Sequence, residues 1–264
     1  MSQPLSITLL LPVLLVSLCL AAQQAPDDPV ANPGRPTIAT PATLTPVGYL
    51  QFETGFLQAT DSPEFSSQTS FNEVMKFSLS RRFELLAGAE PFAHSRAEGQ
   101  SSNGTGVVAL GVQGVVYHGE GARPTIALSY LRRVYNGDAP DLDLGSARSS
   151  ALLLVSADVK GFHYDTNYFF NEVIEDAVHR AQFGQTLSLS HGIGKDFGVT
   201  GEIWHFTQPF LRGNAVGNLW ALTYNVRRNF VLDGGFNRGL TSTSTRWEVF
   251  AGFTYLLPHR LLPQ

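Results

Sequence analysis

The chain has 264 residues, a formal net charge of −4 and 25 glycines, and only 15% of its residues are charged. This length fits one large all-β domain or two small ones. The weakly acidic balance argues against nucleic-acid binding, which needs a clustered basic surface. We therefore expect no nucleic acid among the partners of this protein.

Residues 1–22 are predicted to be a cleaved secretory signal peptide. The stretch from Ile7 to Leu20 is apolar, and the small residues Ala21 and Ala22 offer a cleavage site. The single cysteine, Cys19, lies inside this segment, so the mature chain is not a disulfide scaffold. No later stretch approaches the roughly 18 apolar residues that a membrane helix needs. A mature chain that crosses a membrane must therefore do so with strands.

Residues 23–46 form a proline-rich lead-in. Prolines lack a backbone donor and fix φ, so neither a helix nor a central strand fits this segment. Two interpretations remain open. The lead-in is either a disordered periplasmic segment or a segment that folds back to plug a pore mouth. The prolines that define it are Pro26, Pro29, Pro33, Pro36, Pro41 and Pro46.

Residues 47–257 alternate between apolar and polar side chains, which is typical of strands that present one apolar and one polar face. Near the end of the chain, for example, Trp220, Leu222 and Tyr224 alternate with Ala221 and Thr223. Residues 258–264 are expected to form a short tail. The pattern predicts twelve strands, at about 47–58, 69–80, 83–93, 105–117, 124–135, 149–159, 161–171, 182–193, 197–207, 215–226, 230–239 and 246–257.

The connections between these strands alternate in length. Tight turns are expected near residues 80–82, 160–161, 194–196 and 227–229, with a slightly longer one at 119–124. The alternate connections are longer and more polar, as at 94–104, 136–148 and 172–181. Short turns at one end and long loops at the other are the signature of an outer-membrane barrel. We therefore predict a single antiparallel transmembrane β-barrel of about 12 strands, with short periplasmic turns, longer extracellular loops and both termini in the periplasm.

Strand parity assigns a face to each side chain of this barrel. Apolar and aromatic residues face outwards, towards lipid or the aromatic girdles at the two interfaces. Those singled out are Phe52, Phe71, Phe77, Tyr168, Trp220, Tyr224, Phe236, Trp247, Phe253 and Tyr255. Polar residues face the lumen, and the candidates for lining it are Glu53, Lys76, Glu84, Arg133, Asp158, Asp165, Asn167, Glu202, Asp233, Asn237, Arg246 and Glu248.

Three positions strain this assignment. Glu73 and His191 fall on the outward parity, so either they lie near the rim or a bulge shifts the register. In the strand at 197–207, an inward Glu202 also places Trp204 and Phe206 inside. The inward charges leave two alternatives open. They line a water-filled, mildly acidic passage for neutral or cationic solutes, or they pair with one another and close the interior.

The chain shows no persuasive catalytic or metal site. Its seven histidines form no close pair with ligand spacing. Ser188, Ser190 and His191 are close in sequence, but Ser190 and His191 point to opposite faces of one strand, whereas a triad needs them within hydrogen-bond reach. We therefore expect no enzyme activity, no cofactor and no metal.

Several segments resemble a known family. They are Gly48–Phe56 after a lead that contains Arg35-Pro36, the hairpin Leu79–Leu85, and Asp233–Leu240 followed by Phe250–Tyr255. Together they are similar to the bacterial outer-membrane family named for the MetA pathway of phenol degradation, whose members are described as transporters. The resemblance implies an outer-membrane barrel that admits small aromatic or hydrophobic compounds. The family offers no catalytic residues to carry over.

These observations predict a bacterial outer-membrane protein that reaches its compartment by a cleaved signal. Its expected role is passive transport of small molecules, with hydrophobic or aromatic solutes suggested by the resemblance. The alternative is a plugged structural or adhesive barrel that acts through its extracellular loops, and a third is an outer-membrane hydrolase. The expected partners are outer-membrane lipid and lipopolysaccharide, the barrel-assembly machinery and a small-molecule solute.

Overall fold

The computed structural model describes residues 29–137, 147–175, 177–211 and 213–262. The predicted signal peptide, part of the predicted loop at 136–148 and the last two residues of the tail lie outside these ranges. Within them, the chain forms thirteen β-strands and no helix long and apolar enough to span a membrane. The strands are β1 (Leu50–Thr60), β2 (Ser67–Ser80), β3 (Phe83–Ala97), β4 (Gln100–Gly104), β5 (Val108–Tyr117), β6 (Thr125–Tyr135), β7 (Ala147–Val159), β8 (Phe162–Glu175), β9 (Val178–Ile193), β10 (Phe197–Thr207), β11 (Asn214–Arg227), β12 (Phe230–Gly239) and β13 (Trp247–Leu256).

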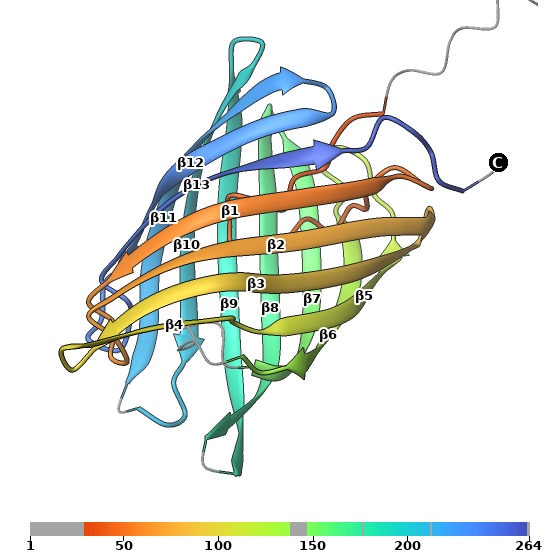
Figure 1. The fold of residues 1–264 in the computed structure, drawn as a ribbon. Coiled ribbons are helices and arrows are strands. Elements are labelled where there is room, and N and C mark those ends of the chain that lie inside the picture. The colour runs from red at the N-terminus through yellow and green to blue at the C-terminus, as the bar shows by residue number, and fades with distance from the viewer. Residues whose placement is uncertain (1–28, 138–146, 176, 212, 263–264) are drawn as a thin grey trace, which may run out of the picture.

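Twelve of these strands close into an antiparallel barrel (Figure 1). Each pairs with its neighbours in the chain, β3 pairs with β5, and the first and last strands close the ring. In the β1–β13 pair, Gln51 lies opposite Leu256 and Thr60 opposite Trp247. Closure removes both open sheet edges, which would otherwise leave unpaired backbone groups along the whole wall. The predicted twelve-strand barrel is confirmed.

The thirteenth strand, β4, was not predicted. It pairs with the far end of β3 and prolongs that strand as a hairpin. Glu98 and Gly99, both with positive φ, form its tip. A similar hairpin replaces the predicted loop at 172–181, because β8 and β9 continue to Glu175 and Val178. Both extensions reach beyond the barrel (Figure 1).

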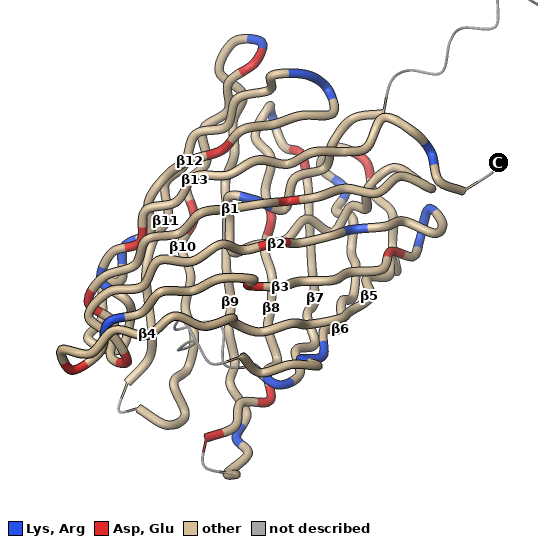
Figure 2. The backbone as a smooth tube through the Cα atoms, viewed as in Figure 1, with Lys and Arg blue, Asp and Glu red and all other residues tan. Residues whose placement is uncertain are grey.

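The two ends of the barrel differ. One end, called here the turn end, carries the tight connections β2–β3, β7–β8, β9–β10 and β11–β12 together with the start of β1 and the end of β13. The tail folds back there, where the Leu261 N–H donates to Gly48 O at 2.7 Å. The opposite end, called the loop end, carries the longer connections and the hairpin extensions. Lys, Arg, Asp and Glu concentrate in the connections and near strand ends (Figure 2).

The side chains alternate across the wall as the period-two pattern predicts. On β10, Thr200, Glu202, Trp204 and Phe206 are all buried, while Ile203 between them is 62% exposed. The ambiguity at this strand is therefore resolved with two large aromatic side chains inside the barrel. The outer surface carries most of the exposed large apolar side chains of the strands, which is the arrangement of a barrel whose outside meets an apolar medium.

Candidate functional site

The interior of the barrel is occupied by the chain's own N-terminal part. Residues 31–45, called here the inner segment, run inside the wall before β1 begins, as the red-to-orange trace shows (Figure 1). Ala31, Ala39 and Ala42 are buried, and Ile38 and Leu44 pack against apolar clusters of the inner wall. The inner segment has no regular secondary structure, as its prolines predict.

The inner segment is held by side chains of the wall, because it forms no ladder with a strand. Buried N–H groups need partners, and here the partners are carboxylate, amide and hydroxyl oxygens. Glu202 accepts from the N–H groups of Ile38 at 2.8 Å and Ala39 at 2.7 Å. The other N–H donors and their acceptors are Asn32 with Gln51, Gly34 with Glu53, Thr40 with Asn167, Ala42 with Ser156 and Thr45 with Glu84.

Two ion pairs of the described residues stand out inside the barrel. Lys76 Nζ is 2.6 Å from Glu53 Oε1, and both side chains are buried. The Arg35 guanidinium binds Asp233 with two hydrogen bonds, from Nε at 3.1 Å and from Nη2 at 2.9 Å. The fork of Arg35 thus ties the inner segment to β12, and such bidentate contacts fix geometry as well as adding energy.

Two glycines make room for Arg35. Gly55 of β1 and Gly252 of β13 lie opposite each other, and Gly252 lies opposite Asp233 on β12. A Cβ added at Gly55 would stand 2.0 Å from the Arg35 guanidinium, and one at Gly252 would stand 2.6 Å from it. The guanidinium therefore packs against the bare backbone of Gly55 and Gly252. A larger side chain at either position would occupy the space that the guanidinium fills.

Cavities lie on both sides of this arginine. On the turn-end side is a cavity of about 380 Å³, called the vestibule, which His163 and Asp165 line together with residues of the inner segment. On the loop-end side is a cavity of about 190 Å³, called the chamber. Arg35, Pro36 and Thr37 line both cavities, so this tripeptide separates them.

The vestibule has a charged rim. His163 Nδ1 is 2.8 Å from Asp158 and Nε2 is 3.2 Å from Asp165, so the ring bridges two carboxylates of β7 and β8. Asp165 also accepts a hydrogen bond from Ser156 at 2.5 Å, and Ser156 in turn accepts from the N–H of Ala42. Among the described residues, no group of three or more His, Cys, Asp and Glu side chains is arranged to hold a metal ion.

The predicted lumen residues fall into three groups by exposure. Those buried in the interior are Glu53, Lys76, Glu84, Asp165, Asn167, Glu202 and Asn237. Arg133, Asp233 and Glu248 are half-buried on the inward parity. Asp158 is exposed at the vestibule rim. Arg246 is also exposed, and it lies in the connection before β13, so the period-two rule that assigned it to the lumen does not apply to it.

The predicted outward aromatics lie on the opposite parity. Phe71, Tyr168, Trp220, Tyr224, Phe236 and Trp247 are exposed, and Phe52, Phe77, Phe253 and Tyr255 are half-buried. Neighbouring rings on this surface contact each other, as in the pairs Phe56–Phe71 at 5.5 Å and Phe236–Trp247 at 6.0 Å. Their contact with lipid stays a prediction.

Glu73 and His191 both keep the outward parity. The ring of His191 lies at the turn end, where Nδ1 is 2.9 Å from Gly161 O and the ring stacks on Phe162. Glu73 lies in mid-strand between Phe71 and Met75, and it accepts a hydrogen bond of 2.9 Å from Thr54 on β1. The rim therefore explains His191 but not Glu73, whose carboxylate faces outwards among apolar side chains.

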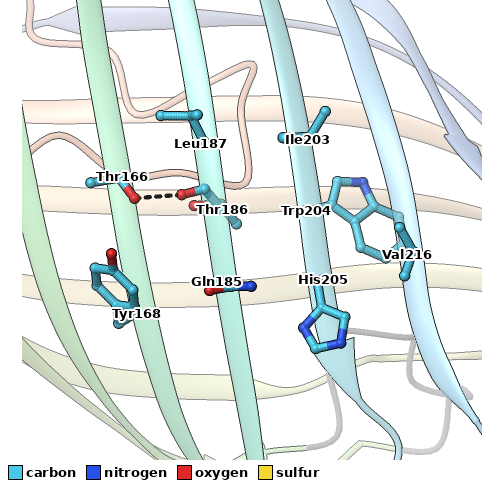
Figure 3. A pocket seen from close by; sticks show the side chains of 9 residues that line it. All are labelled: Thr166, Tyr168, Gln185, Thr186, Leu187, Ile203, Trp204, His205 and Val216. Atoms are coloured by element: carbon cyan, nitrogen blue, oxygen red, sulfur yellow. Dashed lines mark hydrogen bonds between the residues drawn. The ribbon is translucent and has the colours of Figure 1, made fainter.

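The outer wall also carries a depression of about 540 Å³ across β8 to β11 (Figure 3). Tyr168, Gln185, His205 and Val216 form one row across these four strands. Above this row in the view, the Thr166 hydroxyl donates a hydrogen bond to the Thr186 carbonyl of the neighbouring strand (Figure 3). Because these rows face outwards, the depression belongs to the surrounding medium and not to the lumen.

The serine and histidine of the hydrolase hypothesis do not lie within reach of each other. Ser190 is hydrogen-bonded to Thr200 at 2.8 Å, whereas His191 contacts the Gly161 carbonyl on the other face of the strand.

The sequence did not single out Arg35, Gln51 and Ser156 as residues of the lumen. Gln51 and Ser156 stand on inward parity, so a search for neutral acceptors as well as charges would have found them.

Comparisons with known proteins bear on the fold. No family model and no curated protein sequence matches this chain. Among solved structures, the COG4313 outer membrane channel from Pseudomonas putida F1 has a TM-score of 0.60 and 12% identity over 82% of this chain and 98% of that one. NanC porin has a TM-score of 0.57 and 10% identity over 79% and 100% of the two chains. KdgM porin has a TM-score of 0.52 and 12% identity over 78% and 98%. At these identities the likeness shows the outer-membrane barrel fold, and the resemblance to the phenol-degradation family stays a prediction.

Proposed function

We propose that this protein is an outer-membrane channel for small solutes whose lumen is narrowed by its own inner segment. The observation that carries the proposal is the position of residues 31–45 inside a closed barrel, between two cavities that Arg35, Pro36 and Thr37 separate. Twelve strands lie between the eight of a barrel filled by side chains and the sixteen of an open porin. A single extended segment is therefore enough to restrict such a lumen.

The way the inner segment is held supports restriction rather than permanent closure. Apart from the backbone hydrogen bond of the Ala31 N–H to Arg228 O, its polar contacts with the wall are side-chain hydrogen bonds and ion pairs. Each has a net worth of about 0.5–1.5 kcal/mol for a neutral bond and about 1.5–3 kcal/mol for one to a charged group. A sheet ladder would fix every residue of the segment to the wall. Here individual contacts can open while the barrel itself stays closed.

Conductance in planar bilayers tests this proposal. The mature chain should give a small single-channel conductance, and a version that lacks residues 29–46 should give a conductance several times larger. If neither version conducts or supports liposome swelling, transport of water-soluble solutes is excluded. A lateral route for hydrophobic compounds would need a direct uptake assay. A protein that stays soluble without detergent would contradict the membrane assignment itself.

The proposed channel also has an orientation in the membrane and a route to it. We assign the turn end to the periplasm and the loop end to the cell exterior, because outer-membrane barrels place short turns inside and long loops outside. A cleaved signal at residues 1–22, insertion by the barrel-assembly machinery and contact with lipopolysaccharide belong to this proposal. N-terminal sequencing of the membrane-extracted protein would check the cleavage, because an intact Met1 would contradict it.

A plugged structural barrel is the second candidate function. The dense bonding of the inner segment favours it, since at least seven main-chain N–H groups between Asn32 and Thr45 are bound by side chains of the wall. It predicts no conductance from the full chain and a loss of function when the loop-end hairpins are shortened.

A further inference from the structure

The outer wall carries a groove along β9 and β10. The depression of Figure 3 is continued towards the turn end by a second one of about 520 Å³. Leu187 and Ile203 line both depressions, which therefore form one groove, called here the outer groove. From Gln185 to Leu189 it follows β9 for about 13 Å, at about 3.3 Å per residue. That length is close to half of the roughly 25 Å apolar band of an outer-membrane barrel, so the groove can hold an acyl chain of one leaflet.

Three polar side chains line the outer groove without a hydrogen bond. Gln185 and His205 lie opposite each other in the row nearest the loop end, and Asn218 lies opposite Ile203 in the next row. Within the described part of the chain, none of these three side chains has a hydrogen-bond partner. A polar group that faces an apolar medium without a partner is costly. A polar group of the surrounding medium is therefore needed to satisfy them.

The first polar row lies just inside the aromatic residues of the loop end. The rings of Phe170 and Phe183 pair on the outer surface, with 5.7 Å between their centres. They lie two residues beyond Tyr168 and Gln185 along β8 and β9. Aromatic rings on the outside of a barrel mark the depth at which headgroups meet acyl chains. The row of Gln185 therefore stands where acyl chains are joined to their headgroup, and this junction carries carbonyl groups.

Lipopolysaccharide has an oxygen atom for each polar row. Its acyl chains begin at an ester or amide carbonyl, and they carry a second oxygen on the third carbon, which the chains of ordinary phospholipids lack. The Gln185 amide and a ring N–H of His205 can donate to the carbonyl. Asn218, one row deeper, offers a donor and an acceptor to the second oxygen. The apolar part of the groove does not choose between lipids, because all lipid tails are equally apolar.

We propose that the outer groove is a binding site for one acyl chain of lipopolysaccharide. The linkage carbonyl binds Gln185 and His205, and the second oxygen binds Asn218. The tail lies against Leu187 and Ile203. This inference rests on the orientation given to the proposed channel, in which the loop end faces the leaflet that holds lipopolysaccharide. It adds to that function a structural lipid on the outside of the wall.

Native mass spectrometry of the folded barrel tests the site. The protein in detergent is mixed either with purified lipopolysaccharide or with phosphatidylethanolamine, and the bound lipid copies are counted. We expect one lipopolysaccharide to be retained at concentrations where phosphatidylethanolamine is not. Equal retention of the two lipids, or no retention of lipopolysaccharide, would overturn the proposal. A protein dimer formed in place of the lipid complex would overturn it too, because a second copy would then cover the groove.

Substitution of the first polar row tests the carbonyl contacts. Gln185→Leu together with His205→Leu removes both donors and keeps the outer wall apolar, so the barrel should still fold. Loss of two neutral hydrogen bonds should weaken lipopolysaccharide binding about tenfold. Gln58→Leu is the matched control, because Gln58 is an outward glutamine of β1 that does not line the groove. The control should leave binding within about twofold, and equal effects of the two changes would contradict the site.

Substitution of the second polar row tests the choice of lipid. Asn218→Leu should weaken lipopolysaccharide binding about fivefold, the effect of one neutral hydrogen bond, and should leave phosphatidylethanolamine binding unchanged. An unchanged affinity for lipopolysaccharide would contradict the role of Asn218.

Filling the groove gives a test that needs no polar contact. Ile203→Trp should weaken lipopolysaccharide binding at least about tenfold, because the tail loses its contacts with β10. Leu128→Trp makes a similar change at an exposed position of β6 outside the groove and should leave binding within about twofold. Equal binding by both variants would contradict the site.

Conductance is measured separately on the same variants. Lipopolysaccharide binding without conductance in any version would refute the proposed channel and leave the outer groove standing. Conductance without lipopolysaccharide binding would refute the groove alone.

Discussion

The wall and the inner segment solve one problem by opposite means. Both must satisfy buried backbone groups in a place where water is scarce. In the wall, each strand bonds to its neighbours along a continuous register, as for the ten paired positions of β1 and β13. In the inner segment, at least seven N–H groups instead take an oxygen atom from a particular side chain, such as Glu202 for Ile38 and Ala39.

The wall and the inner segment therefore differ in their sensitivity to substitution. A ladder does not depend on side-chain identity, so the wall tolerates single changes that keep the apolar and polar faces. The inner segment depends on a few acceptors. We therefore expect single substitutions in the contacts of the inner segment to alter the lumen without unfolding the barrel.

Removal of Glu202 should have the largest effect. Glu202→Ala leaves two buried N–H groups, those of Ile38 and Ala39, without acceptors, at about 1–3 kcal/mol each. The inner segment should detach locally, and single-channel conductance should rise severalfold while the barrel stays folded. Glu172→Ala, on the outer face near the loop end, is the control and should leave conductance unchanged. A Glu202→Ala barrel with wild-type conductance would remove the distinction between wall and segment.

Removal of Lys76 should have the second-largest effect, which is a loss of barrel stability. Glu53 would stay buried with Gly34 and Gln51 as donors but without its ion-pair partner. Breaking one side of a buried pair costs about 3–5 kcal/mol, and the two remaining hydrogen bonds put the expected loss at the lower end of that range. Urea unfolding in lipid vesicles measures it. Both Lys76→Ala and Glu53→Ala should also change ion selectivity if these side chains line the passage, and unchanged selectivity would argue that they do not.

Removal of Arg35 should have a smaller effect on stability and a visible one on the lumen. Arg35→Ala takes away two hydrogen bonds to Asp233 and leaves that carboxylate without its cation, for an expected loss of about 2 kcal/mol. The vestibule and the chamber should merge, and the conductance should increase. Arg35→Lys is a useful comparison, because a lysine cannot reproduce the bidentate contact and should restore the charge but only part of the wild-type closure.

Replacement of Glu73 should have the smallest effect, and with the opposite sign. This carboxylate faces outwards in mid-strand, and an outward charge in an apolar medium is unfavourable, though less so for Glu than the roughly 2–4 kcal/mol found for Arg or Lys. Glu73→Leu should stabilise the barrel in lipid by up to about 1 kcal/mol, with unchanged conductance. A destabilised Glu73→Leu barrel would show that the bond from Thr54 matters more than the desolvation of the carboxylate.

The wall was largely predictable from the sequence. Period-two alternation is imposed by the barrel itself, so the strand at 230–239 was predicted with its observed bounds and the strand at 246–257 differs by one residue at each end. The sequence pattern was uninformative beyond the barrel wall, where period-two alternation is no longer required. β4, with the sequence Gln100-Ser101-Ser102-Asn103-Gly104, projects beyond the barrel and has no apolar face to reveal it. The assignment of Arg246 to the lumen stays a prediction, because this residue lies just outside β13, where parity no longer assigns a face.

The inner segment could be described from the sequence only as two alternatives. Its prolines exclude a helix and a ladder, but where it lies depends on acceptors far away in the chain. Asn167 and Glu202, for example, bind residues that precede them by 127 and 163 positions. No local pattern encodes such contacts. The inward carboxylates could be predicted by parity, whereas their partners could not.

The seat of Arg35 has a consequence for the order in which the protein assembles. Gly55 comes from the first strand, and Asp233 and Gly252 come from the last two, so the seat exists only once β1 has met β13. Contacts between residues so distant in sequence form late, because loop closure must come first. Arg35 therefore cannot dock on a nascent or unclosed sheet. Its docking would report that the ring is complete, and the rate at which the lumen narrows would then measure the rate of barrel closure.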